Sequence, residues 1–183
     1  LTTSANLATQ NSWTKDGSGP DVTVQNSSSI TYTGYNGGGG NYVQIPSPSG
    51  TTSRVYKGFT STTAIGNTFF VSFLLNLSAV TSSGNYFISL GDPNTGTTYG
   101  PRLFAKESGA GFVLGVSKST NTVNYGSTVY NLNTTYLIVM RFNGVTGSSN
   151  DLAYVWVNPS LASEPNTSLA ECSDVSGTDP GYS

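Results

Sequence analysis

Two polar residues, Asp92 and Asn94, have the types and the spacing of metal ligands. They stand in the stretch Asp92-Pro93-Asn94-Thr95-Gly96, which matches the first half of a calcium-binding loop. The bidentate glutamate that such a loop needs further on is missing, because Leu103 takes its place. The stretch therefore has two interpretations: a calcium site at Asp92 and Asn94, or a turn that an Asx-Pro sequence builds without metal.

The same stretch has the groups that bind a sugar. Tyr99 and Arg102 follow Asp92 and Asn94 closely, and a tyrosine ring has an apolar face for stacking and a polar tip for hydrogen bonding. Tyr125 lies next to another polar loop and is a further candidate. These five residues form the sequence-based hypothesis for a ligand-binding site.

The residues that most enzymes need are missing. The chain has no histidine and one cysteine, which removes Ser-His-Asp and Cys-His catalysis and thiolate zinc sites. Glycoside hydrolysis needs two carboxylates at a defined separation, and here Glu107 stands alone while Glu164, Glu171 and Asp174 fall near the end of the chain. We therefore expect a protein that is not an enzyme, with calcium as the one cofactor to consider.

The composition limits which partners the protein can bind and in which compartment it works. Charged residues are 9% of the chain, against about 25% in ordinary soluble proteins, and the net charge is −2. This charge gives no electrostatic basis for binding nucleic acid. The longest apolar stretch, residues 69–77, is too short to span a bilayer. Since hydroxyl and amide groups must keep such a surface hydrated, we expect a secreted protein that works at the cell surface.

We expect β-strands to position the candidate site residues, because the apolar residues of the chain repeat with a period of two. In residues 69–77 every odd position is apolar, whereas the even positions are mixed. Residues 136–142 and 152–157 alternate in the same way, and turn-forming Gly, Asn, Pro and Ser separate the runs. The pattern predicts an all-β fold, a two-sheet antiparallel sandwich.

The character of the chain changes after Pro159. We expect one sandwich domain over residues 1–159 and a loop-rich tail over residues 160–183 that leads to missing strands or to a further module. Cys172 falls in this tail. It is either a small loop residue or a bridge to another chain.

Several segments resemble the laminin-G-like, concanavalin A-like jelly-roll domain of surface proteins that Bacteroidota export by type IX secretion. The matching segments are Asn11–Thr14, Ile30–Tyr35, Phe69–Leu77, Tyr86–Gly91, Arg102–Lys106, Gly115–Ser119, Tyr130–Leu137 and Asn150–Pro159. The resemblance implies a jelly roll, an accessory role and, in many such domains, calcium at a loop rim. Two parts of the family pattern, an acidic-aromatic opening strand and a final strand pair, are missing from this sequence, which would leave sheet edges needing cover.

Two functions from different classes fit these observations. The leading hypothesis is a non-catalytic binding or adhesion domain of a secreted or cell-surface protein, with polysaccharide as its partner. The alternative is a structural subunit of an extracellular filament or surface layer, completed by strands from neighbouring subunits.

Overall fold

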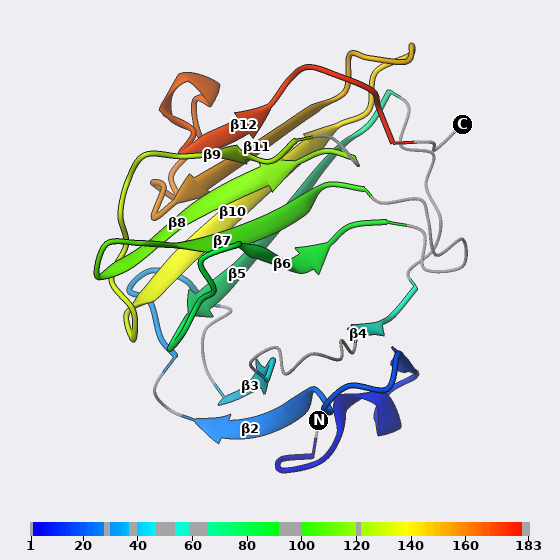
Figure 1. Cartoon of the computed structure of the whole chain (residues 1–183), viewed down its shortest axis with the longest axis vertical. Coiled ribbons are helices and arrows are strands. Elements are labelled where there is room, and N and C mark those ends of the chain that lie inside the picture. Colours follow the sequence, from blue (N-terminus) through cyan, green and yellow to red (C-terminus); the bar gives the residue numbers. More distant parts are fainter. Residues whose placement is uncertain are drawn as a thin grey trace. The chain divides into compact units, whose positions relative to one another are not determined.

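Strands joined by loops make up almost all of the structure (Figure 1). The computed structural model describes residues 2–27, 30–36, 40–46, 54–58, 66–91, 100–119 and 122–180. Every strand pair in these residues is antiparallel. The prediction of an all-β, antiparallel fold is therefore confirmed. The chain forms two compact units, Leu1–Ser61 and Thr62–Ser183, and the expected division at residue 159 falls inside the second.

The first unit has two small strand pairs and a short 3-10 helix, η1 (Leu7–Thr9). Its strands are β1 (Thr14–Asp16) paired with β4 (Arg54–Tyr56), and β2 (Thr23–Ser27) paired with β3 (Gly40–Gln44). A small apolar core holds these elements together, and its members are Leu7, Val22 and Val24, with Trp13 and Val55 packed against them.

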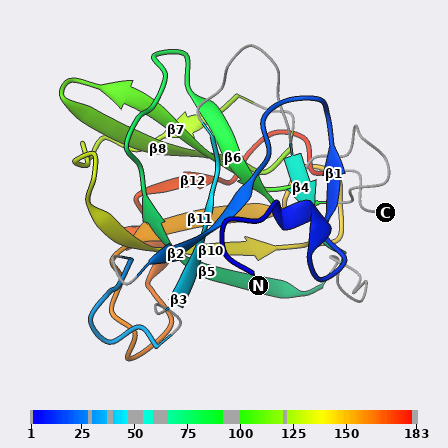
Figure 2. The ribbon, with the colours of Figure 1, turned by 90° about the horizontal axis from the view of Figure 1, so that it is seen from below.

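The second unit has two four-stranded sheets. The first sheet has the order β12-β11-β10-β5, with β5 (Thr68–Asn76), β10 (Thr135–Asn143), β11 (Leu152–Val157) and β12 (Cys172–Asp174). The second has the order β6-β7-β8-β9, with β6 (Asn85–Ser89), β7 (Arg102–Ser108), β8 (Gly111–Ser117) and β9 (Asn124–Tyr125). A second 3-10 helix, η2 (Thr167–Leu169), precedes β12. Figure 2 shows the two layers, with β6, β7 and β8 in one and β5, β10 and β11 in the other.

The two sheets share one hydrophobic core, and the alternation in the sequence sets which residues enter it. On β5, Phe73 faces the core opposite Ile138 of β10, whereas Phe70 is 47% exposed. On β7 and β8 the inward residues are Leu103, Ala105, Phe112, Leu114 and Val116. The predicted register of residues 69–77 is confirmed, because a shift by one residue would have turned Phe70 inward.

Trp156 is buried, but not in the core between the two sheets. Its neighbour Val155 enters the core between the sheets, so Trp156 lies on the outer face of β11. There the ring stacks on Tyr154, with 5.8 Å between centroids, and Nε1 donates a hydrogen bond to the carbonyl of Asn166. The segment after Pro159 therefore supplies the polar partner that a buried indole needs.

Residues 160–180 are mostly loop, and they also complete the first sheet. β12 pairs with β11, where Cys172 lies opposite Val155. The Cys172 side chain is buried in the common core, and burial raises the pKa of its thiol to about 12. A disulfide to another chain would require this strand to open first, so the interpretation of Cys172 as an intermolecular bridge loses its support.

Candidate functional site

Two of the five predicted ligand-binding residues lie on one face of one sheet. Arg102 is on β7 and Tyr125 on β9, and the side-chain alternation directs both to the outer face of the sheet β6–β9. Asp92, Asn94 and Tyr99 lie outside the described residues. These three follow β6 and precede β7 in the sequence, and Arg102 is the first residue of β7.

The outer face of this sheet has an aromatic row that crosses all four strands. Tyr86 of β6 pairs with Phe104 of β7, Phe104 pairs with Gly115 of β8, and Gly115 pairs with Tyr125 of β9. Tyr86 and Phe104 meet edge to face, with 5.8 Å between ring centroids. We call Tyr86, Phe104 and Tyr125 the aromatic row. Sequence reasoning missed Tyr86 and Phe104 as site residues, because only the pairing register shows that they stand beside Tyr125.

Arg102 lies against one end of this row. Its guanidinium carbon is 5.6 Å from the ring centroid of Tyr86 and 5.2 Å from that of Phe104, within the range of cation–π attraction. The same group donates a hydrogen bond to the carbonyl of Ser119, just beyond β8. These contacts hold the guanidinium group on the outer face of the sheet.

Tyr125 lies against Gly115, and that contact needs a glycine. A Cβ atom at Gly115 would come within 2.6 Å of the ring, and one at Gly84 within 2.3 Å of the Tyr125 hydroxyl oxygen. The ring therefore lies across β8 and reaches the turn before β6, and burial raises the pKa of its hydroxyl.

Lys106 covers the same ring. Its ammonium nitrogen is 4.3 Å from the Tyr125 ring centroid. The sequence indicated Tyr125 as a stacking platform for a sugar, but here the ring holds a cation. The side chain of the row that is most open to solvent is Tyr86, which is 40% exposed, whereas Phe104 is 8% exposed.

The outer face of the other sheet has a similar cluster whose charge is neutralised. The guanidinium carbon of Arg141 lies 5.9 Å from the Phe70 ring centroid and 5.7 Å from that of Tyr154. Its nitrogens donate to Glu164 at 2.7 Å and to Asn143 at 2.6 Å. This arginine has a carboxylate partner from its own chain, so its cluster is explained as part of the fold.

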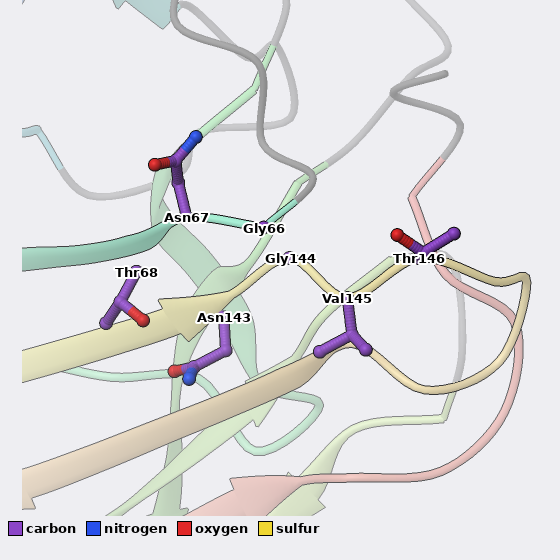
Figure 3. A pocket seen from close by; sticks show the side chains of 7 residues that line it. All are labelled: Gly66, Asn67, Thr68, Asn143, Gly144, Val145 and Thr146. Atoms are coloured by element: carbon purple, nitrogen blue, oxygen red, sulfur yellow. The ribbon is translucent and has the colours of Figure 1, made fainter.

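A shallow cavity of about 380 Å³ lies where β5 and β10 meet the loops at their ends, lined by Gly66, Asn67, Thr68, Asn143, Gly144, Val145 and Thr146. Figure 3 shows its side chains pointing in different directions, with Asn67 on one side of the backbone and Asn143 and Val145 on the other. A small-molecule site needs polar groups that converge on one point. This cavity therefore gives no argument for a ligand.

A buried charge cluster lies beyond the end of β8. Lys118 is fully buried, and its ammonium group donates to Asp179 Oδ1 at 2.8 Å and to the carbonyl of Asp151 at 2.9 Å. Its backbone amide donates to Asp174 Oδ2 at 2.8 Å, and the Asp151 carboxylate accepts from the amide of Val145. Each named group has a partner within the cluster, which joins three loops and the end of β12.

The pKa values of two carboxyl groups in this cluster are shifted in opposite directions. Burial acts to raise the pKa of Asp179, but hydrogen bonds from Lys118 and from the amides of Asn150 and Asp151 outweigh burial and lower it. Burial raises the pKa of Asp151, and the neighbouring Asp179 adds to this. The cluster is a structural ion pair with a sensitivity to acid.

The described residues contain neither a metal-binding cluster nor a membrane-spanning helix. No group of three or more His, Cys, Asp or Glu side chains there could hold a metal ion. No helix in the same part of the chain is long and apolar enough to cross a membrane. The calcium site predicted at Asp92 and Asn94 lies outside the described residues and stays a prediction.

Comparisons with protein-family models, with curated proteins and with solved structures found no match to this chain.

Proposed function

We propose that this chain is a non-catalytic, glycan-binding domain of a secreted, cell-surface protein, and that the outer face of β6–β9 is its binding surface. The observation that carries the proposal is the aromatic row, Tyr86, Phe104 and Tyr125, which crosses four hydrogen-bonded strands. Because the sheet holds these side chains at fixed spacing, ordering them costs little free energy when a ligand binds.

The chemistry of this face suits a sugar chain better than a small apolar molecule. It combines an exposed tyrosine, Tyr86, with two fixed cations, Arg102 and Lys106. Aromatic side chains with a polar end suit a partner that has one apolar face and hydrated polar groups elsewhere. A sugar ring has such an apolar face, edged by hydroxyl groups that accept hydrogen bonds from cations.

For the fold we propose a jelly roll of the concanavalin A-like kind, and a relationship to the laminin-G-like surface domains that the sequence resembles. The support is the sequence resemblance together with two four-stranded antiparallel sheets around one core. The low charge of the chain, 9% of its residues, supports the extracellular location.

The test is a binding panel of immobilised polysaccharides with a matched pair of variants. Tyr86→Ala removes an exposed ring from the proposed surface, and Phe70→Ala removes an exposed ring from the outer face of the other sheet. We expect wild type and Phe70→Ala to bind the same polysaccharide and Tyr86→Ala to lose most of that binding, with all three proteins equally stable. Absence of binding to every polysaccharide, or equal binding by both variants, would contradict the proposal.

The alternative, a structural subunit of a filament or surface layer, has less support. In this alternative Cys172 would form the covalent link between subunits, but its side chain is buried in the common core. The alternative now depends on strand addition at a sheet edge. A single monomeric peak in size-exclusion chromatography over a wide concentration range would count against it.

A further inference from the structure

We propose that the ligand of the outer face of β6–β9 is an acidic polysaccharide, one with carboxylate or sulfate groups, and that Lys106 selects it. This inference rests on the proposed function. It starts from the charges on that face, where the outward positions of the four strands include two charged residues, Arg102 and Lys106, both positive. Glu107, the next residue on β7, follows the alternation to the opposite side.

Lys106 keeps its charge available for a ligand. Within the described residues, salt bridges to carboxylates hold Lys15, Arg54, Lys118 and Arg141. No carboxylate of the described residues lies within salt-bridge distance of Lys106. Its ammonium group instead lies over the Tyr125 ring. A π system attracts a cation but does not neutralise it, so this half-buried charge remains to be paired.

The ring and two glycines give that charge a fixed position. Gly115 and Gly84 leave the space in which Tyr125 lies, and Tyr125 holds the ammonium 4.3 Å from its centroid. A charge that is already positioned loses less side-chain entropy when it binds an anion. Such a charge-assisted hydrogen bond is stronger than a neutral one.

The spacing between the two cations suits a ligand that is a polymer. Arg102 and Lys106 are four residues apart on one strand, so their backbones are about 13 Å apart on the same face. Phe104 lies between them, with Tyr86 on the neighbouring strand β6 and Tyr125 two strands away on β9. A chain of sugars that has repeated anionic groups can place one of them on Lys106 while a ring further along the chain lies against Tyr86, the exposed ring of the row.

The experiment compares polygalacturonate with its methyl ester, which has the same backbone without the charge, by isothermal titration calorimetry. Alginate and chondroitin sulfate extend the acidic set, and dextran and xylan the neutral one. We expect binding to at least one acidic polymer, weaker binding to its neutral counterpart, and affinity that falls as NaCl rises from about 50 to 300 mM. Lys106→Gln should weaken acidic binding about tenfold, while Lys106→Arg should retain it. Lys57→Gln, which removes an exposed charge from the other unit, is the matched control and should bind like wild type.

The outcomes separate this inference from the function on which it rests. Binding to neutral polymers at equal or higher affinity would overturn the acidic class and leave a glycan-binding domain. Equal binding to polyglutamate, a polyanion without sugar rings, would overturn it too, because charge alone would then explain the affinity. Binding to no polysaccharide at all would overturn the proposed function itself.

Discussion

The ammonium nitrogen of Lys118 lies 2.8 Å from Oδ1 of Asp179, although 61 positions separate the two residues in the chain. Both side chains are nearly inaccessible to water, at 0% and 7% exposure. The pair joins the end of β8 to residues beyond β12, and the amides of Asn150 and Asp151 donate to the same carboxylate. A buried charge of this kind stabilises the fold only while its partner is present.

Removing one member of this pair should be costly. Lys118→Met keeps the length of the side chain and leaves Asp179 buried without its cation, and we expect a loss of about 3–5 kcal/mol in the free energy of unfolding. The matched control is Lys15→Met, which breaks the partly exposed pair with Asp21 and should cost less than about 1 kcal/mol. Urea unfolding followed by tryptophan fluorescence measures both. Equal losses would mean that the buried pair contributes no more than an exposed one.

The contribution of Asp179 should disappear in acid. Its pKa is lowered in the fold, so it stabilises the folded state above its unfolded pKa of about 3.9 and loses this contribution as the pH falls through the folded value. Asp151, whose pKa is raised by burial, works in the opposite direction and offsets part of the loss in wild type. The stability difference between wild type and Asp179→Asn should therefore be largest near about pH 7 and shrink below about pH 4. A difference that is unchanged at about pH 3 would exclude this explanation.

The strand pattern predicted which residues of the larger unit enter the core, because a strand that is buried on one face has apolar residues at alternate positions. Residues 69–77 and 136–142 have the register that their alternation indicates. The alternation of residues 152–157 does not show which face of β11 holds Trp156, because both faces of this strand are apolar. β12 was missed because three residues, Cys172–Asp174, are too few to show a period.

The candidate site was only partly predictable from the sequence. Arg102 and Tyr125 were chosen for their types and their neighbouring loops, and the structure places both on one face. Tyr86 and Lys106 gave no local signal. Their part in the site depends on which strands pair and in which register, and this is decided by contacts between residues distant in sequence.

The two faces of β5 should respond differently to mutation. Phe73 packs against the common core and Phe70 is exposed, so Phe73→Ala should cost about 3 kcal/mol and Phe70→Ala less than about 1 kcal/mol. Thermal and urea unfolding of the two variants measure the difference. Losses of equal size would show that this strand is buried on both faces.

Gly115 should tolerate no larger residue. In Gly115→Ala the new Cβ would lie 2.6 Å from the Tyr125 ring and 2.8 Å from a methyl group of Val123, so the ring must move away with Lys106. We expect a loss of about 1–3 kcal/mol in stability, together with weaker binding to the acidic polymer. The control is Gly58→Ala, which meets no atom within 4 Å and should change neither property. An unchanged Gly115→Ala protein would mean that the contact between Tyr125 and Gly115 does not position Lys106.

The central claim, that the outer face of β6–β9 is the binding surface, is tested most directly by amide chemical shifts. The isotope-labelled protein is titrated with a short oligomer of the polysaccharide that binds most tightly in the panel. The account predicts that the largest shift changes fall on Tyr86, Arg102, Lys106 and Tyr125 and their strand neighbours, and that Phe70, Arg141 and Tyr154 on the other sheet do not move. Largest changes on the sheet β12-β11-β10-β5, or within Leu1–Ser61, would contradict it.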